Sequence, residues 1–150
     1  MQAADWHAPT TGDPIRAHTR ATSNARIDRA TFEHLDEALR SSETIRIRLH
    51  ELDKEWTVDR ALMLNFAIAG SVSAGLAIHG AIKHGRISGW TALLGAQLAF
   101  LAHHAIRRWC PPMPVFRRLG FRSDREICAE RVALQRRLIE LEGLAGPRIA

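Results

Sequence analysis

Two long apolar runs dominate the hydrophobic pattern of this chain. Residues 61–82 are twenty-two residues without a charge, and residues 87–106 are twenty more. At about 1.5 Å per helical residue, each run reaches roughly 30 Å, the thickness of a bilayer's hydrocarbon core. The four residues between them, 83–86, are long enough only for a tight turn. The pattern therefore predicts two antiparallel transmembrane helices.

Small residues recur on one face of each run, at spacings of three and four. In the first run they are Ala67, Gly70, Ala74, Ala77 and Ala81, and in the second run Gly89, Ala92, Ala96 and Ala99, continued by His103. Small residues let helix backbones approach closely in lipid. We therefore expect these two strips to form the contact between the helices.

Amphipathic segments lie on both sides of the apolar runs. Residues 25–56 are predicted to form a helix, with Ser41 and Ser42 as the point at which it divides; its apolar positions are Phe32, Leu35, Leu39, Ile45, Leu49, Leu52 and Trp56. Residues 123–145 are predicted to form a second amphipathic helix, because Ser123 and Glu126 have capping-box spacing. Its apolar stripe consists of Ile127, Leu134, Leu138, Leu141 and Ala145. We expect the two to pack together, within one chain or between copies. The alternative for residues 25–56, a helix lying flat on the membrane, is disfavoured by the acids on its polar face.

The remaining segments are irregular. Residues 1–24 contain Pro9, Gly12 and Pro14 and have no apolar periodicity, so they are predicted to be disordered. Beyond the second run, Pro111 and Pro112 are expected to end the helix. A short interfacial helix should follow and end at Gly120, with Met113, Phe116 and Leu119 toward lipid.

Charge is distributed unevenly along the chain. The formal charge is +5, and residues 107–150 hold ten basic but only five acidic side chains. Basic residues beside apolar spans act as topology signals, which predicts that both termini are cytoplasmic. Anionic lipid headgroups are the expected partners of Arg107, Arg108, Arg117 and Arg118. Nucleic acid is not expected as a partner, because no recognition motif accompanies the charge.

The stretch "HHAIRRWC" at 103–110 contains residue types that bind metals or carry out redox chemistry. His103 and Cys110 are two helical turns apart, about 10 Å, which is too far for one ion without a break in the backbone. We therefore interpret His103 and His104 as packing or interfacial residues, and predict no metal, cofactor or catalytic residue, Cys128 included. Arginines beside Cys110 would favour a thiolate, but no base or second vicinal cysteine accompanies it.

Polar residues within the two apolar runs are functional candidates by their position alone. They are Asn65, His79, Gln97, His103 and His104. None carries a fixed charge, and two helices do not enclose a transport pathway.

Two stretches carry a resemblance to a known family. They are "TVDRALMLNFAIAGSVSAG" at 57–75 and "HHAIRRWCPPMPVFRRLGFRSDREICAERVAL" at 103–134. The chain resembles, over about residues 55–137, the YgaP-like inner-membrane domain family, a two-helix module found alone in bacteria or fused behind a rhodanese sulfurtransferase domain. Its most specific features are Asp59-Arg60, Cys110-Pro111 and the run 118–120. The resemblance implies a membrane hairpin without an established activity, and no sulfurtransferase nucleophile, because the rhodanese domain is missing.

The sequence as a whole predicts an all-α integral membrane protein, and the resemblance implies that its membrane is the bacterial inner membrane. A transmembrane hairpin with its exit segment occupies residues 57–122, between two cytoplasmic amphipathic helices. The favoured function is not enzymatic: a structural or interaction module that self-associates or recruits a partner. The alternative is a membrane-bound sulfur or redox accessory that uses Cys110.

Overall fold

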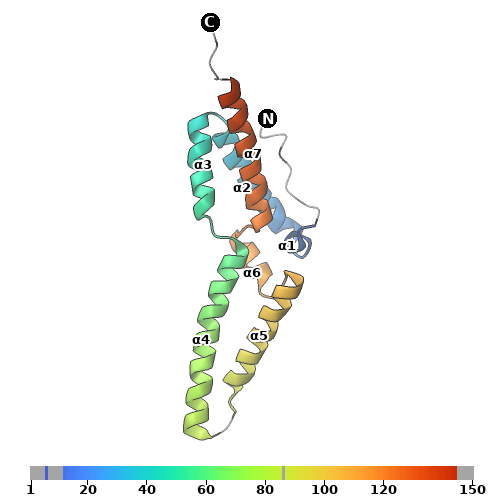
Figure 1. Ribbon diagram of the computed structural model, residues 1–150. Helices are drawn as coiled ribbons and strands as arrows, with labels where there is room; N and C mark the ends of the chain where they lie inside the picture. The colour runs from blue at the N-terminus through green and yellow to red at the C-terminus, as the bar shows by residue number, and fades with distance from the viewer. Residues whose placement is uncertain (1–5, 7–11, 86, 145–150) are drawn as a thin grey trace.

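The computed structural model describes residues 6, 12–85 and 87–144, and their regular structure is helical. The helices are α1 (Pro14–Ala17), α2 (Ala21–Ala38), α3 (Ser42–Lys54), α4 (Val58–His84), α5 (Gly89–Arg107), α6 (Met113–Leu119) and α7 (Asp124–Leu144). Figure 1 shows an elongated molecule with two halves. Helices α4 and α5 form a hairpin at one end, α2, α3 and α7 form a bundle at the other, and α1 and α6 lie at the junction.

The apolar stripes of the flanking segments meet in the core of the bundle. This core consists of Leu35, Ala38, Ile45, Leu52, Ile127, Ala133 and Leu134. Because α2 and α3 both pack against α7, the predicted contact between the two amphipathic segments is made within one chain. Phe32 and Trp56, at the ends of the predicted stripe, remain exposed.

Serine caps begin two of the helices in the bundle. Ser41 Oγ accepts a hydrogen bond from the Thr44 amide, and Thr44 Oγ1 accepts one from the Ser41 amide, both at 3.1 Å. This capping box starts α3, so residues 25–56 form parts of two helices that divide at the predicted serines. The capping box of α7 is confirmed, because Glu126 Oε2 accepts from the Ser123 amide at 2.8 Å and Ser123 Oγ accepts from the Glu126 amide at 3.2 Å.

Residues 13–24 are ordered, so the prediction of disorder is wrong for them. Asp13 caps α1 by accepting a hydrogen bond from the Ile15 amide at 2.9 Å, and α2 begins at Ala21. Asp13, Ile15 and Arg16 are buried against segments more than forty residues away, which local periodicity does not reveal. Of the rest of the predicted segment, Trp6 packs against the bundle core, and residues 1–5 and 7–11 lie outside the described residues.

Helix α4 matches the first apolar run. It has 27 residues and is, among the helices described here, the one long and apolar enough to cross a membrane. It ends at Gly85, whose φ of 62° is the left-handed conformation that glycine adopts readily. Helix α5 matches the second run but does not pass the same test. Gln97 and the two histidines lower its mean hydropathy.

The contact between α4 and α5 differs from the predicted one on the α5 side. The face turned toward the rest of the protein carries Leu94, Gln97, Leu101 and His104, whereas Gly89, Ala92, Ala96, Ala99 and His103 are exposed. Gln97 Nε2 donates to Ser73 Oγ at 3.1 Å, and Ser73 Oγ donates to the Ala69 carbonyl at 2.8 Å. Polar groups in an apolar setting gain more from pairing than small residues gain from close contact, so the predicted α5 strip is wrong.

The α4 strip is partly correct. Ala77 is buried, and Gly70 and Ala74 are half-buried, but Ala67 and Ala81 face outward. A Cβ added at Gly70 would lie 3.6 Å from Gln97 Oε1, so this glycine is next to the interhelical hydrogen bond.

The exit from α5 also differs from the prediction. The helix ends at Arg107, before the prolines, and Arg108 takes a left-handed conformation with φ 55°. Helix α6 then ends at Gly120 as expected. Met113 is buried beside Ile15, Val58, Leu62 and Cys110. The prediction that Met113 faces lipid is therefore wrong, because α6 packs beside the start of α4 at the junction (Figure 1) and turns this side chain into the apolar cluster.

Candidate functional site

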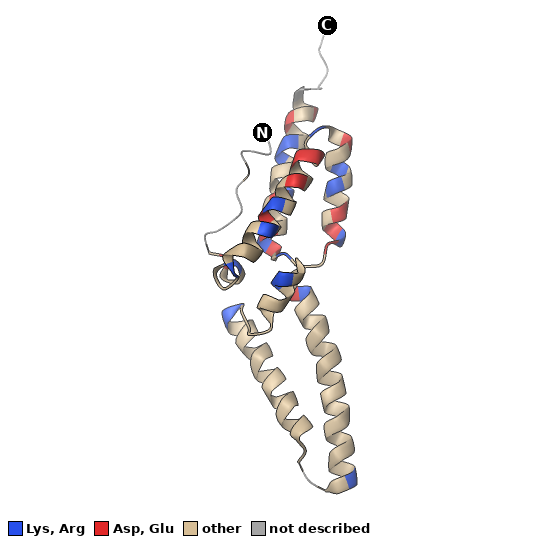
Figure 2. Cartoon of the chain, turned by 180° about the vertical axis from the view of Figure 1, so that it is seen from behind, with Lys and Arg blue, Asp and Glu red and all other residues tan. Residues whose placement is uncertain are grey.

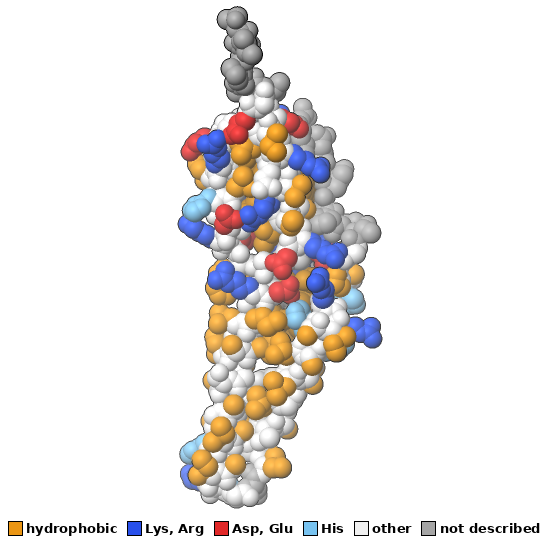
Figure 3. All heavy atoms as spheres, in the orientation of Figure 1, with side chains coloured by type: hydrophobic (Ala, Val, Ile, Leu, Met, Phe, Trp, Pro, Cys, Tyr) orange, Lys and Arg blue, Asp and Glu red, His pale blue; other side chains and the backbone are white. Residues whose placement is uncertain are grey.

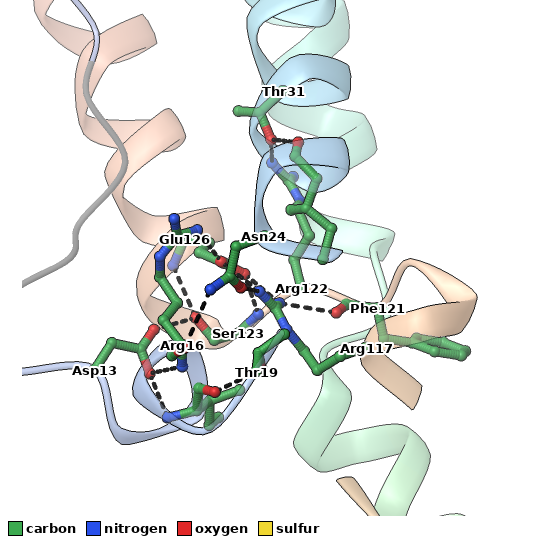
Figure 4. Close-up of polar contacts among 12 residues, drawn as sticks. Asp13, Arg16, Thr19, Asn24, Thr31, Arg117, Phe121, Arg122, Ser123 and Glu126 are labelled. Carbon is green, nitrogen blue, oxygen red and sulfur yellow. Dashed lines mark hydrogen bonds and ion pairs between the residues drawn. The ribbon is translucent and has the colours of Figure 1, made fainter. Parts of the chain in front are cut away.

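A layer of buried ion pairs joins the bundle to the hairpin (Figure 4). We call it the ion-pair layer and define it by Arg16, Asn24, Asp28, Arg48, Glu55, Arg117, Arg122, Glu126 and Glu130. The side chains come from α1, α2, α3, α6, α7 and the two connections that precede α4 and α7. Most of the segments at the junction thus contribute to one of two neighbouring polar networks.

Arg117 and Glu126 form the first half of this layer. Arg117 is fully buried and donates to both carboxylate oxygens of Glu126, at 2.6 and 2.8 Å. It also donates to the Phe121 carbonyl at 3.0 Å and to Asn24 Oδ1 at 2.8 Å. Arg16 donates to Glu126 at 2.5 Å and holds Asp28 with two further hydrogen bonds. Such multiple charge-assisted bonds fix orientation as well as compensate charge.

Arg122 and Glu130 form the second half. Arg122 donates in a bidentate manner to Glu55, with both distances 2.6 Å, and to Thr31 Oγ1 at 3.0 Å. It also donates to Glu130, which accepts a second bond from Arg48 Nε at 2.8 Å. The amide of Val58 donates to the Arg122 carbonyl at 2.8 Å. The start of α4 is therefore tied to the segment that leads into α7.

Mutual contact favours the charged forms of Glu126 and Arg122. Burial alone would raise the pKa of Glu126, but the hydrogen bonds and charge of Arg117 hold it below its ordinary value. Burial alone would lower the pKa of Arg122, but Glu55 and Glu130 raise it. With its buried ion pairs, the layer is therefore a structural clamp between the segments at the junction.

A cleft lies next to this clamp, where the hairpin meets the bundle. We call it the junction cleft; its volume is about 310 Å³, and its charged or titratable side chains are Asp13, Asp59, His104, Arg108, Asp124 and Arg125. Met63 and Ile15 add apolar wall. Figure 3 shows acidic and basic side chains next to one another above the apolar hairpin.

His104 and Asp59 meet in the wall of the cleft. The His104 ring is 6% exposed, and its Nε2 lies 3.2 Å from Asp59 Oδ1, which links the end of α5 to the start of α4. The other ring nitrogen, Nδ1, is buried and has no hydrogen-bond partner among the described residues. A buried imidazole nitrogen without a partner is unusual, because it normally finds a donor or acceptor.

Comparisons with protein-family models, curated proteins and solved structures found no match for this chain. The resemblance to the YgaP-like family therefore stays a prediction.

Cys110 is buried in the protein and is not exposed to solvent or to a cleft. Its side chain is fully buried, and burial raises the pKa of its thiol. The direction of this pKa shift is opposite to the thiolate that Arg107 and Arg108 were expected to favour, because burial and the nearby Asp59 carboxylate both disfavour the charged form. Cys128 is exposed on α7.

The other predicted candidates are separated from one another. Within the described chain there is no group of three His, Cys, Asp or Glu side chains arranged to hold a metal ion. His103 is exposed and contacts the Trp109 ring edge-on, with centroids 6.1 Å apart. Asn65 and His79 are also exposed, whereas Gln97 is bound to Ser73.

Three of the four arginines predicted to contact lipid headgroups are at the surface. Arg107, Arg108 and Arg118 are exposed. Arg117 is in the ion-pair layer, so the prediction is wrong for this side chain. Its carboxylate partner Glu126 is nine residues away, beyond the reach of a local helical pattern.

The ion-pair layer and the junction cleft were missed by sequence reasoning. One signal was available: Glu126 and Glu130 are four residues apart and flank the apolar stripe of α7 at Ile127 and Leu134. If the fold buries acidic side chains beside an apolar stripe, they need cationic partners in the interior. The identity of those cations depends on contacts across the fold, such as Arg16 with Glu126, separated by 110 residues.

Proposed function

We propose that this chain is a membrane-anchored interaction module of the bacterial inner membrane. In this proposal, α4 and α5 cross the bilayer as a hairpin, both termini are cytoplasmic, and the α2–α3–α7 bundle is held at the membrane surface. There the bundle self-associates or recruits a partner. The chain performs no catalysis of its own.

The observation that carries the proposal is the separation of charge along the molecule. In Figure 2, acidic and basic residues crowd the bundle, whereas those of the hairpin lie near its ends. The outward faces of the hairpin expose large apolar side chains: Met63, Leu64, Ile68, Val72, Leu76, Ile78, Ile82, Ile87, Trp90, Leu93, Leu98, Phe100 and Ile106. An apolar surface of this extent needs a cover, and the lengths of the runs fit a bilayer.

The second span depends on the first. Helix α5 is the less apolar of the two, but Gln97 pairs with Ser73 and His104 pairs with Asp59, so both polar side chains face protein rather than lipid. Polar groups are tolerated in a membrane when a neighbouring helix pairs with them. We infer that α5 inserts as a partner of α4.

Thiol labelling tests the topology. One variant keeps Cys128 and replaces Cys110 with serine; the other places a cysteine at Lys83 in a chain without either native cysteine. A membrane-impermeant maleimide should label the Lys83→Cys chain in intact spheroplasts, and should label Cys128 only after lysis. Labelling of both positions from the same side would contradict a hairpin that crosses the bilayer. A preparation released by alkaline carbonate would contradict insertion altogether.

Self-association has a separate test. Ile47 and Ile139 are 53% and 70% exposed on the bundle and offer apolar contact to a second copy or a partner. Purification in mild detergent, followed by light scattering and identification of bound proteins, should give an oligomer or a retained partner. The double variant Ile47→Asp/Ile139→Asp should lose it. A wild-type monomer with no retained protein would remove this part of the proposal.

A further inference from the structure

We propose that the junction cleft binds the headgroup of a zwitterionic aminophospholipid, with phosphatidylethanolamine as the type. Arg108 and Arg125 would hold the phosphate, and Asp59 and Asp124 would hold the ammonium group. This inference rests on the proposed membrane placement and adds a specific lipid to it.

The position of the cleft fits a headgroup. Its walls come from α1, the first turns of α4, the end of α5 and the start of α7, where the apolar hairpin meets the charged bundle. In a bilayer this is the level of the phosphates. Met63 lines the cleft and is exposed, so an apolar surface continues from the cleft down the outside of α4.

The charges of the cleft are only partly paired by the protein. Asp13 is fully engaged, because it accepts from the Ile15 amide and from Ser123 Oγ at 2.6 Å. Asp124 and Arg108 form no ion pair with any residue that the structure describes. Arg125 uses one nitrogen on the Gly12 carbonyl and retains other donors. Asp59 has one oxygen, Oδ1, 3.2 Å from His104 Nε2, which leaves its second oxygen. That oxygen, the Asp124 carboxylate and the two guanidinium groups therefore remain for a ligand.

The junction cleft contains both acidic and basic side chains, and this determines which class of ligand fits it. An anion alone would meet the carboxylates of Asp59 and Asp124, and a cation alone would meet two arginines. A ligand with one phosphate and one primary ammonium group satisfies both, because guanidinium groups bind phosphate and an ammonium group donates to carboxylates.

Lipid competition tests the proposal on the full chain. The protein in mild detergent is mixed with equal amounts of phosphatidylethanolamine, phosphatidylcholine and phosphatidylglycerol with identical acyl chains. Retained lipid is then measured by native mass spectrometry. Phosphatidylethanolamine should be retained about tenfold over each of the others, the equivalent of one hydrogen bond to a charged group. Phosphatidylcholine tests the ammonium contact directly, because its quaternary nitrogen has no hydrogen to donate.

Matched variants separate the two halves of the site. Asp124→Asn should abolish the preference over phosphatidylcholine, whereas Arg108→Gln should reduce retention of all three lipids. Arg136→Gln, exposed on α7 and outside the cleft, and Asp36→Asn, exposed on α2, should behave as wild type. Circular dichroism of each variant confirms that its helices are intact.

Three outcomes would overturn this inference while leaving the membrane proposal in place. They are equal retention of the three lipids, cleft variants that match the Arg136→Gln control, and binding of soluble glycerophosphoethanolamine without retention of any lipid. Release of the wild-type chain by alkaline carbonate would instead overturn the membrane proposal, and so the two failures are distinguishable.

Discussion

Arg117 and Glu126 show how this protein keeps opposite charges in its interior. Both side chains are at most 2% exposed, and each oxygen of the carboxylate accepts a hydrogen bond from the guanidinium group. Burying an ion pair costs desolvation on both sides, and the geometry recovers much of that cost. Removing one partner is therefore far more costly than the net contribution of the pair suggests.

Replacing Arg117 with methionine should destabilise the fold by about 3–5 kcal/mol, because it leaves Glu126 with a single cation in a buried site. Chemical unfolding in mild detergent, followed by circular dichroism, measures the change. Arg118→Met is the matched control: its side chain is exposed, and a change within about 0.5 kcal/mol is expected. Equal effects of the two substitutions would show that the ion-pair layer does not hold the junction together.

Acid should weaken the fold through Glu126. Its folded-state pKa lies below the ordinary 4.5, so the unfolded chain binds more protons as the pH falls through that range. The stabilisation by this group is complete above about pH 4.5 and decreases toward its folded-state pKa. Glu126→Gln should lower stability at neutral pH and flatten the acid limb of the curve of stability against pH. Glu33→Gln, exposed on α2, should leave that limb unchanged.

The helices could be predicted from the sequence wherever local signals define them. The capping box at Ser123, the break at Ser41 and the glycine that ends α4 are each defined by neighbouring residues. The face of α5 that packs against the protein was not predicted, because small-residue spacing and the polar pair of Gln97 with Ser73 favour different rotations of the helix. Choosing between them requires knowledge of both helices.

The cap of α3 gives a prediction at the scale of one element. Ser41→Ala should destabilise the bundle by about 1 kcal/mol, since the Thr44 amide loses its acceptor. Ser42→Ala, one residue along and inside the helix, should change the free energy of unfolding by less than about 0.5 kcal/mol. Thermal unfolding of both variants makes the comparison. A larger loss from Ser42→Ala would mean that α3 starts elsewhere.

The two halves of the molecule follow different rules of burial. The bundle hides its apolar stripes inside and exposes charge, whereas the hairpin exposes apolar side chains on its outer faces. The ion-pair layer and the junction cleft lie where the bundle meets the hairpin. Local periodicity predicted both halves, but it did not predict the junction, because the side chains there come from segments far apart in the chain.

One pair of substitutions distinguishes a membrane hairpin from a soluble one. Val72 is 56% exposed at the middle of α4, and Ile139 is 70% exposed on α7. In lipid, Val72→Arg should cost about 2.5–3.5 kcal/mol of insertion free energy, so more of the chain should be extracted by alkaline carbonate. Ile139→Arg adds the same charge on the bundle and should leave the membrane fraction unchanged. If Val72→Arg instead left that fraction intact and improved solubility without detergent, the exposed face of α4 would be in water, and both the anchor and the lipid site that depends on it would be wrong.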